Sequence, residues 1–215
     1  MIVVIDYGMG NLRSVSKALE SLGASVRVSS DPADVQRAAK VILPGVGAFP
    51  AAMRELKARG LIKPVKSAIA SGRPYLGICL GLQLLLERSE EGEGAEGLGV
   101  LQGTVKRFSF DAGRRTQDAG LKIPHMGWNQ ISTQRTAHSA QEKCPLLKDI
   151  PEGSFVYFVH SYYADPADHS IVAEETEYGG RFCSMVWRGN LYATQFHPEK
   201  SQSVGLKLLE NFIEL

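Results

Sequence analysis

The stretch that decides the fold reads Pro74-Tyr75-Leu76-Gly77-Ile78-Cys79-Leu80-Gly81-Leu82-Gln83. A short apolar run with a β-branched residue stops at Cys79, and an apolar segment, Leu82 to Leu86, begins at once. This pattern predicts a strand that passes directly into a helix. Glycine stands two residues before and two residues after the cysteine. The Gly-x-Cys-x-Gly spacing is the thiol form of the nucleophile elbow, a sharp strand-to-helix turn that exposes its central side chain.

The glycines and the helix start both bear on the chemistry of Cys79. A Cβ at either glycine position would collide with the neighbouring strand or helix in so tight a turn. Unpaired N–H groups and the positive end of the helix dipole lie at the first turn, where they favour thiolate over thiol. Taken alone, the motif also suits a small buried hydrophobic residue at a strand end. A nucleophilic cysteine therefore needs support from elsewhere in the chain.

That support comes from a second motif near the other end of the chain, Gln195-Phe196-His197-Pro198-Glu199. A base and a carboxylate two residues apart, after a β-like run, supply the remaining members of a triad of Cys79, His197 and Glu199. His197 would deprotonate the thiol and later protonate the leaving group, while Glu199 orients the imidazole and stabilises its charged form. A histidine in such a loop is ordinarily a surface residue, but the two motifs together predict a cysteine nucleophile.

Length and composition exclude several classes of protein. The chain has 215 residues, 44% apolar and 22% charged, as is usual for a soluble globular protein with a full core. A net charge of +1 indicates neither nucleic acid nor anionic membrane as a partner. Three cysteines without framework spacing favour a reducing compartment. No basic leader precedes the short apolar run at the start, and no stretch approaches the ~20 apolar residues of a membrane span, so a cytosolic protein is expected.

The first half of the chain alternates strands and helices. Ile2 to Ile5 is a continuous apolar run, typical of a central strand in a parallel sheet. After a glycine-rich turn, apolar residues recur at helical spacing until Gly23, a helix C-cap. Further strands are expected over residues 25–28, 41–43 and up to Cys79. Between them lie a helix opened by Pro32 and two more, one carrying Ala52, Met53 and Leu56, the other Val65 and Ile69. Function is expected at the carboxyl ends of the strands.

The second half of the chain changes character. Residues 90–97 form an acidic, glycine-rich loop that is mobile by composition, and residues 111–120 are a polar loop. Strands are expected over residues 100–110, 129–133, 155–159, 171–173, 182–187 and 191–195, before a helix with Val204, Leu208, Leu209, Phe212 and Ile213 on one face. The fold class is α/β: a doubly wound, mostly parallel central sheet with helices on both faces and additional antiparallel strands in the C-terminal half. All 215 residues are assigned to one domain.

Acyl transfer needs an oxyanion site near the sulfur. One donor is expected to be the backbone N–H of Leu80, directly after the nucleophile. The turn Pro44-Gly45-Val46-Gly47 ends a neighbouring strand and could supply a second N–H, although a plain β-turn fits it as well. Gln83 falls one helical turn after Cys79 on the same face. Its amide could fix a polar substrate, and Glu91 could hold a substrate ammonium group, although solvent exposure explains either residue equally well.

Two rival sites are weaker. Cys79, His197 and Glu199 are all possible zinc ligands, but no fourth ligand is obvious among His125, His138, His160 and His169, so no metal or cofactor is expected. The turn Gly8-Met9-Gly10 suggests a dinucleotide site, yet it lacks the third glycine and the acidic residue after the second strand. Its glycines are better explained by the turn itself.

The motifs around Cys79 and His197 resemble those of the triad-type (class I) glutamine amidotransferases. Five further stretches extend the resemblance over essentially the whole chain: residues 5–11, 44–49, 122–129, 157–162 and 196–201. Many relatives in other pathways carry histidine between Gly81 and Gln83 and serine after the Pro-Glu. Leu82 and Lys200 resemble instead the branch of the family that serves histidine biosynthesis.

The resemblance implies that Cys79 attacks the side-chain amide of L-glutamine, releases ammonia and leaves a γ-glutamyl thioester that water hydrolyses to glutamate. It implies an oxyanion hole completed by the turn at Gly45 and Val46. It also implies that the substrate is held by Gly47, Gln83, Glu91, Ser161 and Tyr162.

A partner is expected because one glutaminase domain occupies the whole chain and nothing remains to use the ammonia. The family's solution is a separate (β/α)₈-barrel cyclase subunit, which uses ammonia to make imidazole glycerol phosphate. The residues that resemble interface positions are Asn11, Trp128, Tyr157 and Lys200, although Trp128 and Tyr157 also suit a core. Two other functions stay open: a stand-alone γ-glutamyl or peptide hydrolase, and a non-catalytic α/β binding module with a structural Cys79.

Overall fold

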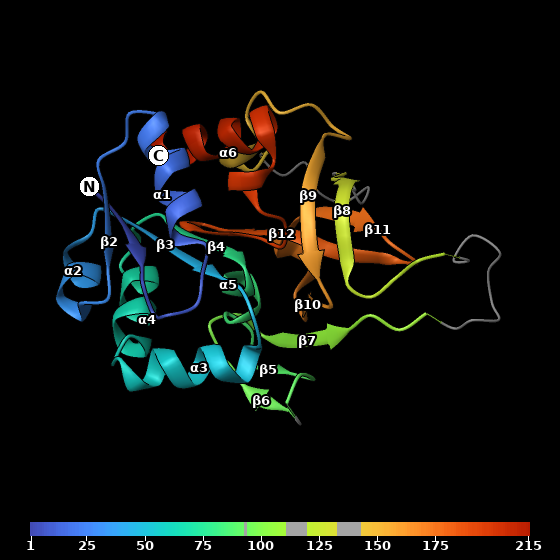
Figure 1. Ribbon diagram of the computed structural model, residues 1–215, viewed down its shortest axis with the longest axis horizontal. Helices are drawn as coiled ribbons and strands as arrows, with labels where there is room; N and C mark the ends of the chain where they lie inside the picture. The colour runs from blue at the N-terminus through green and yellow to red at the C-terminus, as the bar shows by residue number, and fades with distance from the viewer. Residues whose placement is uncertain (93, 111–119, 133–142) are drawn as a thin grey trace.

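The computed structural model describes residues 1–92, 94–110, 120–132 and 143–215 (Figure 1). The expected polar loop of residues 111–120 lies outside these ranges except for Gly120, and so does His138, a candidate zinc ligand. No helix in the described ranges is long and apolar enough to cross a membrane.

A block of five parallel strands forms the centre of the fold. In spatial order they are β2 (Val26–Ser29), β1 (Ile2–Ile5), β3 (Lys40–Gly45), β4 (Tyr75–Cys79) and β13 (Leu191–Thr194). Four of these strands come from the first half of the chain, and β13 comes from near its end. The C-terminal strand therefore lies directly beside β4, the strand that ends at Cys79.

Beyond β13 the same sheet continues mainly with antiparallel strands. They are β12 (Arg181–Arg188), β10 (Tyr162–Pro166), β7 (Gly103–Arg107), the two-residue strands β5 (Arg88–Ser89) and β6 (Ala95–Glu96), and β11 (Val172–Glu177), which pairs with β12. One further parallel pair joins β5 to β7. The predicted fold class, a mostly parallel centre with antiparallel additions, is confirmed.

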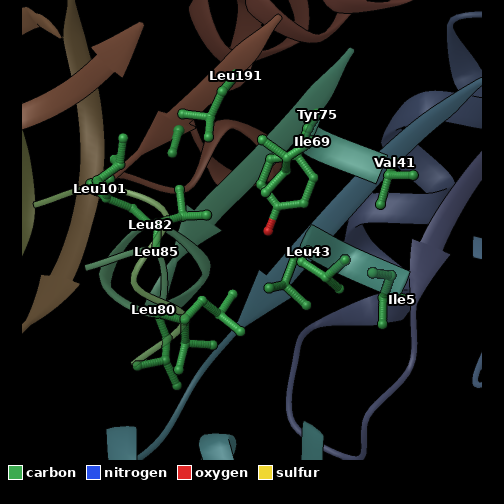
Figure 2. Close-up of a cluster of buried hydrophobic side chains, with 14 of the residues drawn as sticks. Ile5, Val41, Leu43, Ile69, Tyr75, Leu80, Leu82, Leu85, Leu101 and Leu191 are labelled. Carbon is green, nitrogen blue, oxygen red and sulfur yellow. The ribbon is translucent and has the colours of Figure 1, made fainter. Parts of the chain in front are cut away.

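Helices cover both faces of the parallel block (Figure 1). They are α1 (Leu12–Ser21), α2 (Pro32–Arg37), α3 (Phe49–Ala58), α4 (Ile62–Ala70), α5 (Leu80–Gln83) and α6 (Gln202–Glu214). Along β1 the side chains alternate between two cores. Val3 and Ile5 join the cluster beneath α2, α3 and α4, whereas Ile2 and Val4 join the cluster beneath α1 and α6. Figure 2 shows part of the first cluster, with the ring of Tyr75 among leucine, isoleucine and valine side chains.

A separate antiparallel hairpin pair, β8 (His125–Gln130) and β9 (Phe155–His160), stands against the extended sheet. Its inner side chains, among them Phe158, are buried. Its outer face exposes Met126, Trp128 and Phe155, three large apolar side chains. Buried and exposed side chains alternate in this way along antiparallel strands that pack on one face and are open to solvent on the other.

The helix predicted after Cys79 is only one turn long. Residues 80–83 are helical, and the chain then leaves the helix although the apolar run continues to Leu86. Backbone N–H groups of residues 97–101 donate to the carbonyls of Leu84, Leu85, Leu86 and Glu87, so a returning loop replaces the helical hydrogen bonds. Because so short a helix has little dipole, the dipole argument for the thiolate loses most of its weight.

Other predicted elements differ in detail. The strand expected at 129–133 lies earlier, as β8, and the strand expected at 171–173 begins only at Val172, after a 3₁₀ turn at His169–Ile171. The acidic loop at 90–97 contains β6, which pairs with β5, so part of it is a short hairpin. Strand β10 was not predicted, because Tyr162–Pro166 has no clear alternation and contains proline.

Candidate active site

Cys79 is the last residue of β4 and has the strained backbone conformation φ 56°, ψ −107°. The two flanking glycines explain how the chain tolerates this turn. A Cβ on Gly77 would lie 2.7 Å from the carbonyl oxygen of Gly81, and one on Gly81 would overlap the carbonyl oxygen of Leu43 in β3. The strand-to-helix elbow predicted from the sequence is therefore present, and only glycine fits at these two positions.

The histidine and carboxylate follow β13. His197 precedes a 3₁₀ turn, Pro198–Lys200, and its Nδ1 lies 2.9 Å from Oε1 of Glu199. Both side chains are almost fully buried. His197 is held further by its backbone, whose N–H donates to the carbonyl of Tyr157 and whose carbonyl accepts from the hydroxyl of Ser201. The imidazole is thus oriented by a carboxylate, as a general base requires.

The electrostatics of His197 involve the sulfur of Cys79. Burial lowers the pKa of His197, but the charge and close approach of the Cys79 thiolate, then the hydrogen bond and charge of Glu199, outweigh it and raise this pKa to about 10. Nε2 is buried without a hydrogen bond of normal geometry to any described residue. This arrangement favours the charged form of the His197 imidazole beside the sulfur of Cys79.

We expect the Cys79→Ala substitution to lower the pKa of His197, because burial opposes the imidazolium and the neighbouring thiolate does most to raise this pKa. In the wild type, the raised pKa means that stabilisation from the charged form is complete below about pH 6.5 and is lost as the pH rises toward 10. NMR titration of the imidazoles checks this, since the chain has five histidines. The exposed His169 provides an internal control, and an unchanged His197 titration would contradict the expectation.

The sulfur of Cys79 has two polar neighbours that the sequence did not single out. Gln195 donates from Nε2 to Sγ over 3.6 Å, and Sγ lies 3.9 Å from the carbonyl oxygen of Val159. Gln195 is fully buried at the end of β13. The only sequence signal for it was its place two residues before His197, which strand alternation turns toward the same side.

The expected oxyanion residues lie beside the nucleophile. Gly45 pairs with Cys79 in the register of β3 and β4. A Cβ on Gly45 would lie 2.8 Å from Cβ of Leu80 and 2.5 Å from the hydroxyl of Tyr7, so the two backbones approach closely. Val46 follows at the surface and is 39% exposed. This close approach of the two segments is what an oxyanion hole built from both of them would need.

A cavity of about 430 Å³ opens onto Cys79. This volume suits a small polar molecule. The cavity is lined by Val46, Gly47, Cys79, Leu80, Gln83, Glu91, Pro124, Val159, His160, Ser161 and Tyr162. The structure thus brings together all five residues expected to hold a substrate. Pro124, Val159 and His160 were not predicted to line it, although they lie within the motifs at residues 122–129 and 157–162.

Two of the expected substrate-binding side chains already have protein partners. Gln83 donates from Nε2 to the carbonyl of Tyr162, over 2.8 Å, and to Oε1 of Gln195, over 3.1 Å. Both of its N–H groups are thereby used, and only its oxygen remains for a ligand. Glu91 accepts through Oε2 from the backbone N–H of Phe49, the first residue of α3, over 2.8 Å.

The expected interface residues gather around the hairpin. Trp128 is 46% exposed, so it is not a core aromatic, and its ring meets that of Tyr157 at a centroid distance of 6.0 Å. Nζ of Lys200 lies 5.7 Å from the Tyr157 ring centroid. Asn11 is the half-buried residue before α1 and makes no side-chain cap bond. Helix α1 contacts the 3₁₀ turn that contains Lys200.

The rival sites gain no support. Among the described residues, no group of three His, Cys, Asp or Glu side chains is arranged to hold a metal ion. Burial lowers the pKa of His125 to about 4 and that of His160 to about 3, so both are neutral. In the turn at Gly8, the carboxylate of Asp6 accepts the Gly8 N–H over 2.9 Å. The Asp6 side chain thus closes this turn, as the explanation of its glycines by the turn itself requires.

Comparison with known proteins identifies relatives over the whole chain. The family model "Glutamine amidotransferase class-I" matches residues 3–215. The imidazole glycerol phosphate synthase subunit HisH of Syntrophotalea carbinolica is 54% identical over 212 residues, covering 99% of this chain and 98% of that protein. The HisH subunit of Aromatoleum aromaticum is also 54% identical, covering 99% and 97%.

Solved structures agree on the fold. A crystal structure described as a glutamine amidotransferase superposes with a TM-score of 0.72 at 18% identity and covers 100% of this chain. PurLQS from Thermotoga maritima gives 0.71 at 17% identity, covering 99%. From the family match and the full-length relatives, the chain belongs to the class-I glutamine amidotransferase family and, within it, to the HisH subunits of imidazole glycerol phosphate synthase.

Proposed function

We propose that Cys79, His197 and Glu199 carry the glutaminase reaction of this enzyme, in which L-glutamine is hydrolysed to glutamate and ammonia. One observation carries the proposal. A buried imidazole, oriented by a carboxylate 2.9 Å away, interacts electrostatically with a sulfur that opens onto a cavity of about 430 Å³. Membership of the family makes the chain a glutamine amidotransferase of histidine biosynthesis.

In the first step, the Cys79 thiolate attacks the side-chain carbonyl carbon of glutamine. The carbonyl oxygen becomes an oxyanion, which N–H groups of Leu80 and the Gly45–Val46 turn stabilise. The tetrahedral intermediate then collapses, and the imidazolium of His197 gives its proton to the departing nitrogen. Ammonia leaves, and a γ-glutamyl thioester on Cys79 remains.

In the second step, water hydrolyses the thioester. Neutral His197 takes a proton from water as the oxygen attacks the thioester carbon. A second oxyanion forms in the same place and collapses to glutamic acid and the Cys79 thiolate. Glu199 stays ionised throughout and stabilises each imidazolium that forms. The cycle ends with the thiolate–imidazolium pair restored.

The substrate is held on both sides of the sulfur. We assign the α-ammonium group to the carboxylate of Glu91, whose Oε2 accepts the Phe49 N–H. The oxygen of Gln83 accepts an N–H of the substrate, because its own N–H groups are occupied. Gly47, Ser161 and Tyr162 also line the cavity.

The names of the relatives describe a subunit, so a partner subunit completes the synthase. We propose that the partner is a (β/α)₈-barrel cyclase, which uses the ammonia to form imidazole glycerol phosphate. It would cover the outer hairpin face, where Met126 and Phe155 are more than half exposed beside Trp128. An exposed apolar surface of this kind marks an interaction site. Tyr157, Lys200 and Asn11 would complete this surface.

The remaining proposals concern the setting of the reaction. We assign all 215 residues to one catalytic domain. We propose that its reaction requires no cofactor and that it binds neither nucleic acid nor a membrane. The three free, buried cysteines suit the reducing cytosol.

The test is ammonia release from glutamine, with and without the barrel subunit. We expect release to rise when the barrel is added and the complex to make imidazole glycerol phosphate. Hydrolysis of γ-glutamyl peptides that is indifferent to the barrel would instead favour a stand-alone hydrolase.

We expect the Trp128→Ala substitution to weaken binding of the barrel subunit by about 30-fold, because a half-exposed tryptophan at the centre of an interface is commonly a hot spot. Isothermal titration calorimetry measures the change. The control is Val28→Ala, which removes an exposed apolar side chain from the opposite edge of the sheet. Equal affinities for wild type and Trp128→Ala would place the interface elsewhere.

A further inference from the structure

Gln195 is a polar side chain that touches the nucleophile and has no part in the mechanism above. Its amide is fully buried between β13 and the helix start, and its Nε2 lies 3.6 Å from Sγ of Cys79. Such a separation is a hydrogen-bonding distance for the large sulfur atom. Burying a primary amide is costly unless its groups are paired.

The hydrogen-bond network fixes which end of the Gln195 amide faces the sulfur. Nε2 of Gln83 lies 2.8 Å from the carbonyl oxygen of Tyr162, which can only accept. That end of Gln83 is therefore the donor, and its second N–H points to Oε1 of Gln195, 3.1 Å away. With its oxygen held by Gln83, Gln195 must present its N–H groups to Cys79.

A second set of buried groups holds the same Tyr162 carbonyl. Nδ1 of His160 donates to it over 2.9 Å, so Nε2 of that neutral ring is an acceptor. Nδ1 of His125 lies 3.0 Å from this Nε2 and is the donor. Nε2 of His125 then accepts from Nδ2 of Asn129, over 3.3 Å. Burial keeps both rings neutral, since it lowers their pKa values to about 3 and about 4.

The donors thus run in one direction, from Asn129 on β8 through His125 and His160 to the Tyr162 carbonyl. The amide of Asn129 is itself oriented, because its Oδ1 accepts the N–H of Gln130 and its Nδ2 also donates to the carbonyl of Glu177. Gln83 joins the carbonyl of Tyr162 to Gln195. Every member of this chain has a defined donor or acceptor role, which rigidifies a buried polar network.

We propose that Gln195 is a further catalytic residue, whose amide N–H stabilises the Cys79 thiolate, and that His160 and His125 are positioning residues that keep this N–H aimed at the sulfur. The proposal rests on Cys79 being the nucleophile. The N–H interacts with the charged sulfur of the free enzyme and weakly with the neutral sulfur of the thioester. It therefore favours the thiolate before attack and again as the leaving group when water cleaves the thioester.

The test is the pH dependence of Cys79 alkylation by iodoacetamide, followed by mass spectrometry. Cys144 and Cys183 are buried, and burial raises the pKa of both thiols, that of Cys144 to about 12, so the alkylation of Cys79 is resolved. We expect Gln195→Met to raise the pH of half-maximal alkylation by about one unit, a tenfold change in the ionisation constant of the thiol, because one charge-assisted hydrogen bond is lost. Gln195→Glu should raise it further, through repulsion between like charges.

Thr194→Val is the matched control. It removes a buried hydroxyl from the adjacent residue, which donates to the Phe196 carbonyl and has no link to the sulfur. Its alkylation profile should equal that of the wild type. An unshifted profile in Gln195→Met, or an equal shift in Thr194→Val, would overturn the proposal. If the methionine variant fails to fold, Gln195→Leu, which also lacks an N–H donor and adds no charge, provides the answer.

The positioning role has its own readout. His125→Asn retains a donor near the place of Nδ1, whereas His125→Leu removes it. We expect the leucine variant to shift the alkylation profile in the same direction as Gln195→Met and the asparagine variant to restore it. Equal profiles in the two His125 variants would overturn the positioning role. Alkylation needs neither glutamine nor the barrel subunit, so it tests the role of Gln195 alone. The glutaminase proposal is tested independently, by ammonia release.

Discussion

Replacing Cys79 by alanine is expected to lower kcat for glutamine hydrolysis by about four orders of magnitude or more, as removal of a covalent nucleophile does in other acyl-transfer enzymes. The substitution leaves the cavity, the oxyanion turn and the base in place but removes the atom that forms the thioester. Water cannot substitute for the sulfur, because the ground-state amide is held for attack from the position of Sγ. Ammonia release by the complex with the barrel subunit measures the loss.

A measurement of thermal stability distinguishes loss of the nucleophile from misfolding of the variant. Cys79 is 5% exposed, and its loss removes only one sulfur from the core, so the thermal midpoint should change by a few degrees at most. Cys183→Ala is the matched control, since Cys183 is a free cysteine of similar burial in β12, with its sulfur 3.6 Å from the carbonyl of Met185. It should retain activity. Ammonia release by Cys79→Ala at the wild-type rate would remove Cys79 as the nucleophile.

Replacing Gly81 by alanine is expected to reduce the free energy of unfolding by about 4 kcal/mol or more, among the largest effects of a single methyl group. The added Cβ would overlap the carbonyl oxygen of Leu43, which belongs to the backbone of β3 in the centre of the sheet. No side chain can rotate away to make room, so either the elbow or the strand must move. Urea denaturation followed by circular dichroism measures the change.

Gly60→Ala distinguishes this steric effect from ordinary backbone strain. Gly60 has φ 66°, and an added Cβ there would meet no atom within 4 Å. The substitution should therefore cost only about 1–2 kcal/mol, the usual penalty for a left-handed alanine. Equal losses of stability in the two variants would mean that the contact with Leu43 relaxes freely, and that the elbow does not depend on the missing side chain.

Much of the central fold could be predicted because its signals are local. Ile2 to Ile5 is apolar on every residue, and this pattern occurs where both faces of a strand are covered. The glycines at 77 and 81 predicted an elbow for the same reason, since the requirement for a small residue is set by immediate neighbours. The family resemblance added the interface positions and, for the substrate, Gly47, Ser161 and Tyr162, which have no local signature.

The features that could not be predicted depend on distant contacts. The helix after Cys79 ends after one turn, and the N–H groups of residues 97–101 bond the carbonyls of residues 84–87 that follow it; nothing in residues 80–86 indicates that loop. From the sequence, Gln195 is only the last residue of a predicted strand. Its position next to Cys79 becomes evident only when β13 pairs with β4. The roles of Gln83 and Glu91 as partners of Gln195 and Phe49 likewise follow only from the three-dimensional arrangement.

The position of β13 has a consequence for biosynthesis of the protein. The ribosome makes β1 to β4 early, and these strands can collapse together, but β13 must be translated and inserted beside β4 before His197 reaches Cys79. Under the proposed mechanism, a chain that ends before β13 has the thiol of Cys79 without its base. Such incomplete molecules should therefore hydrolyse no glutamine, because the reaction needs a strand that is made long after the nucleophile.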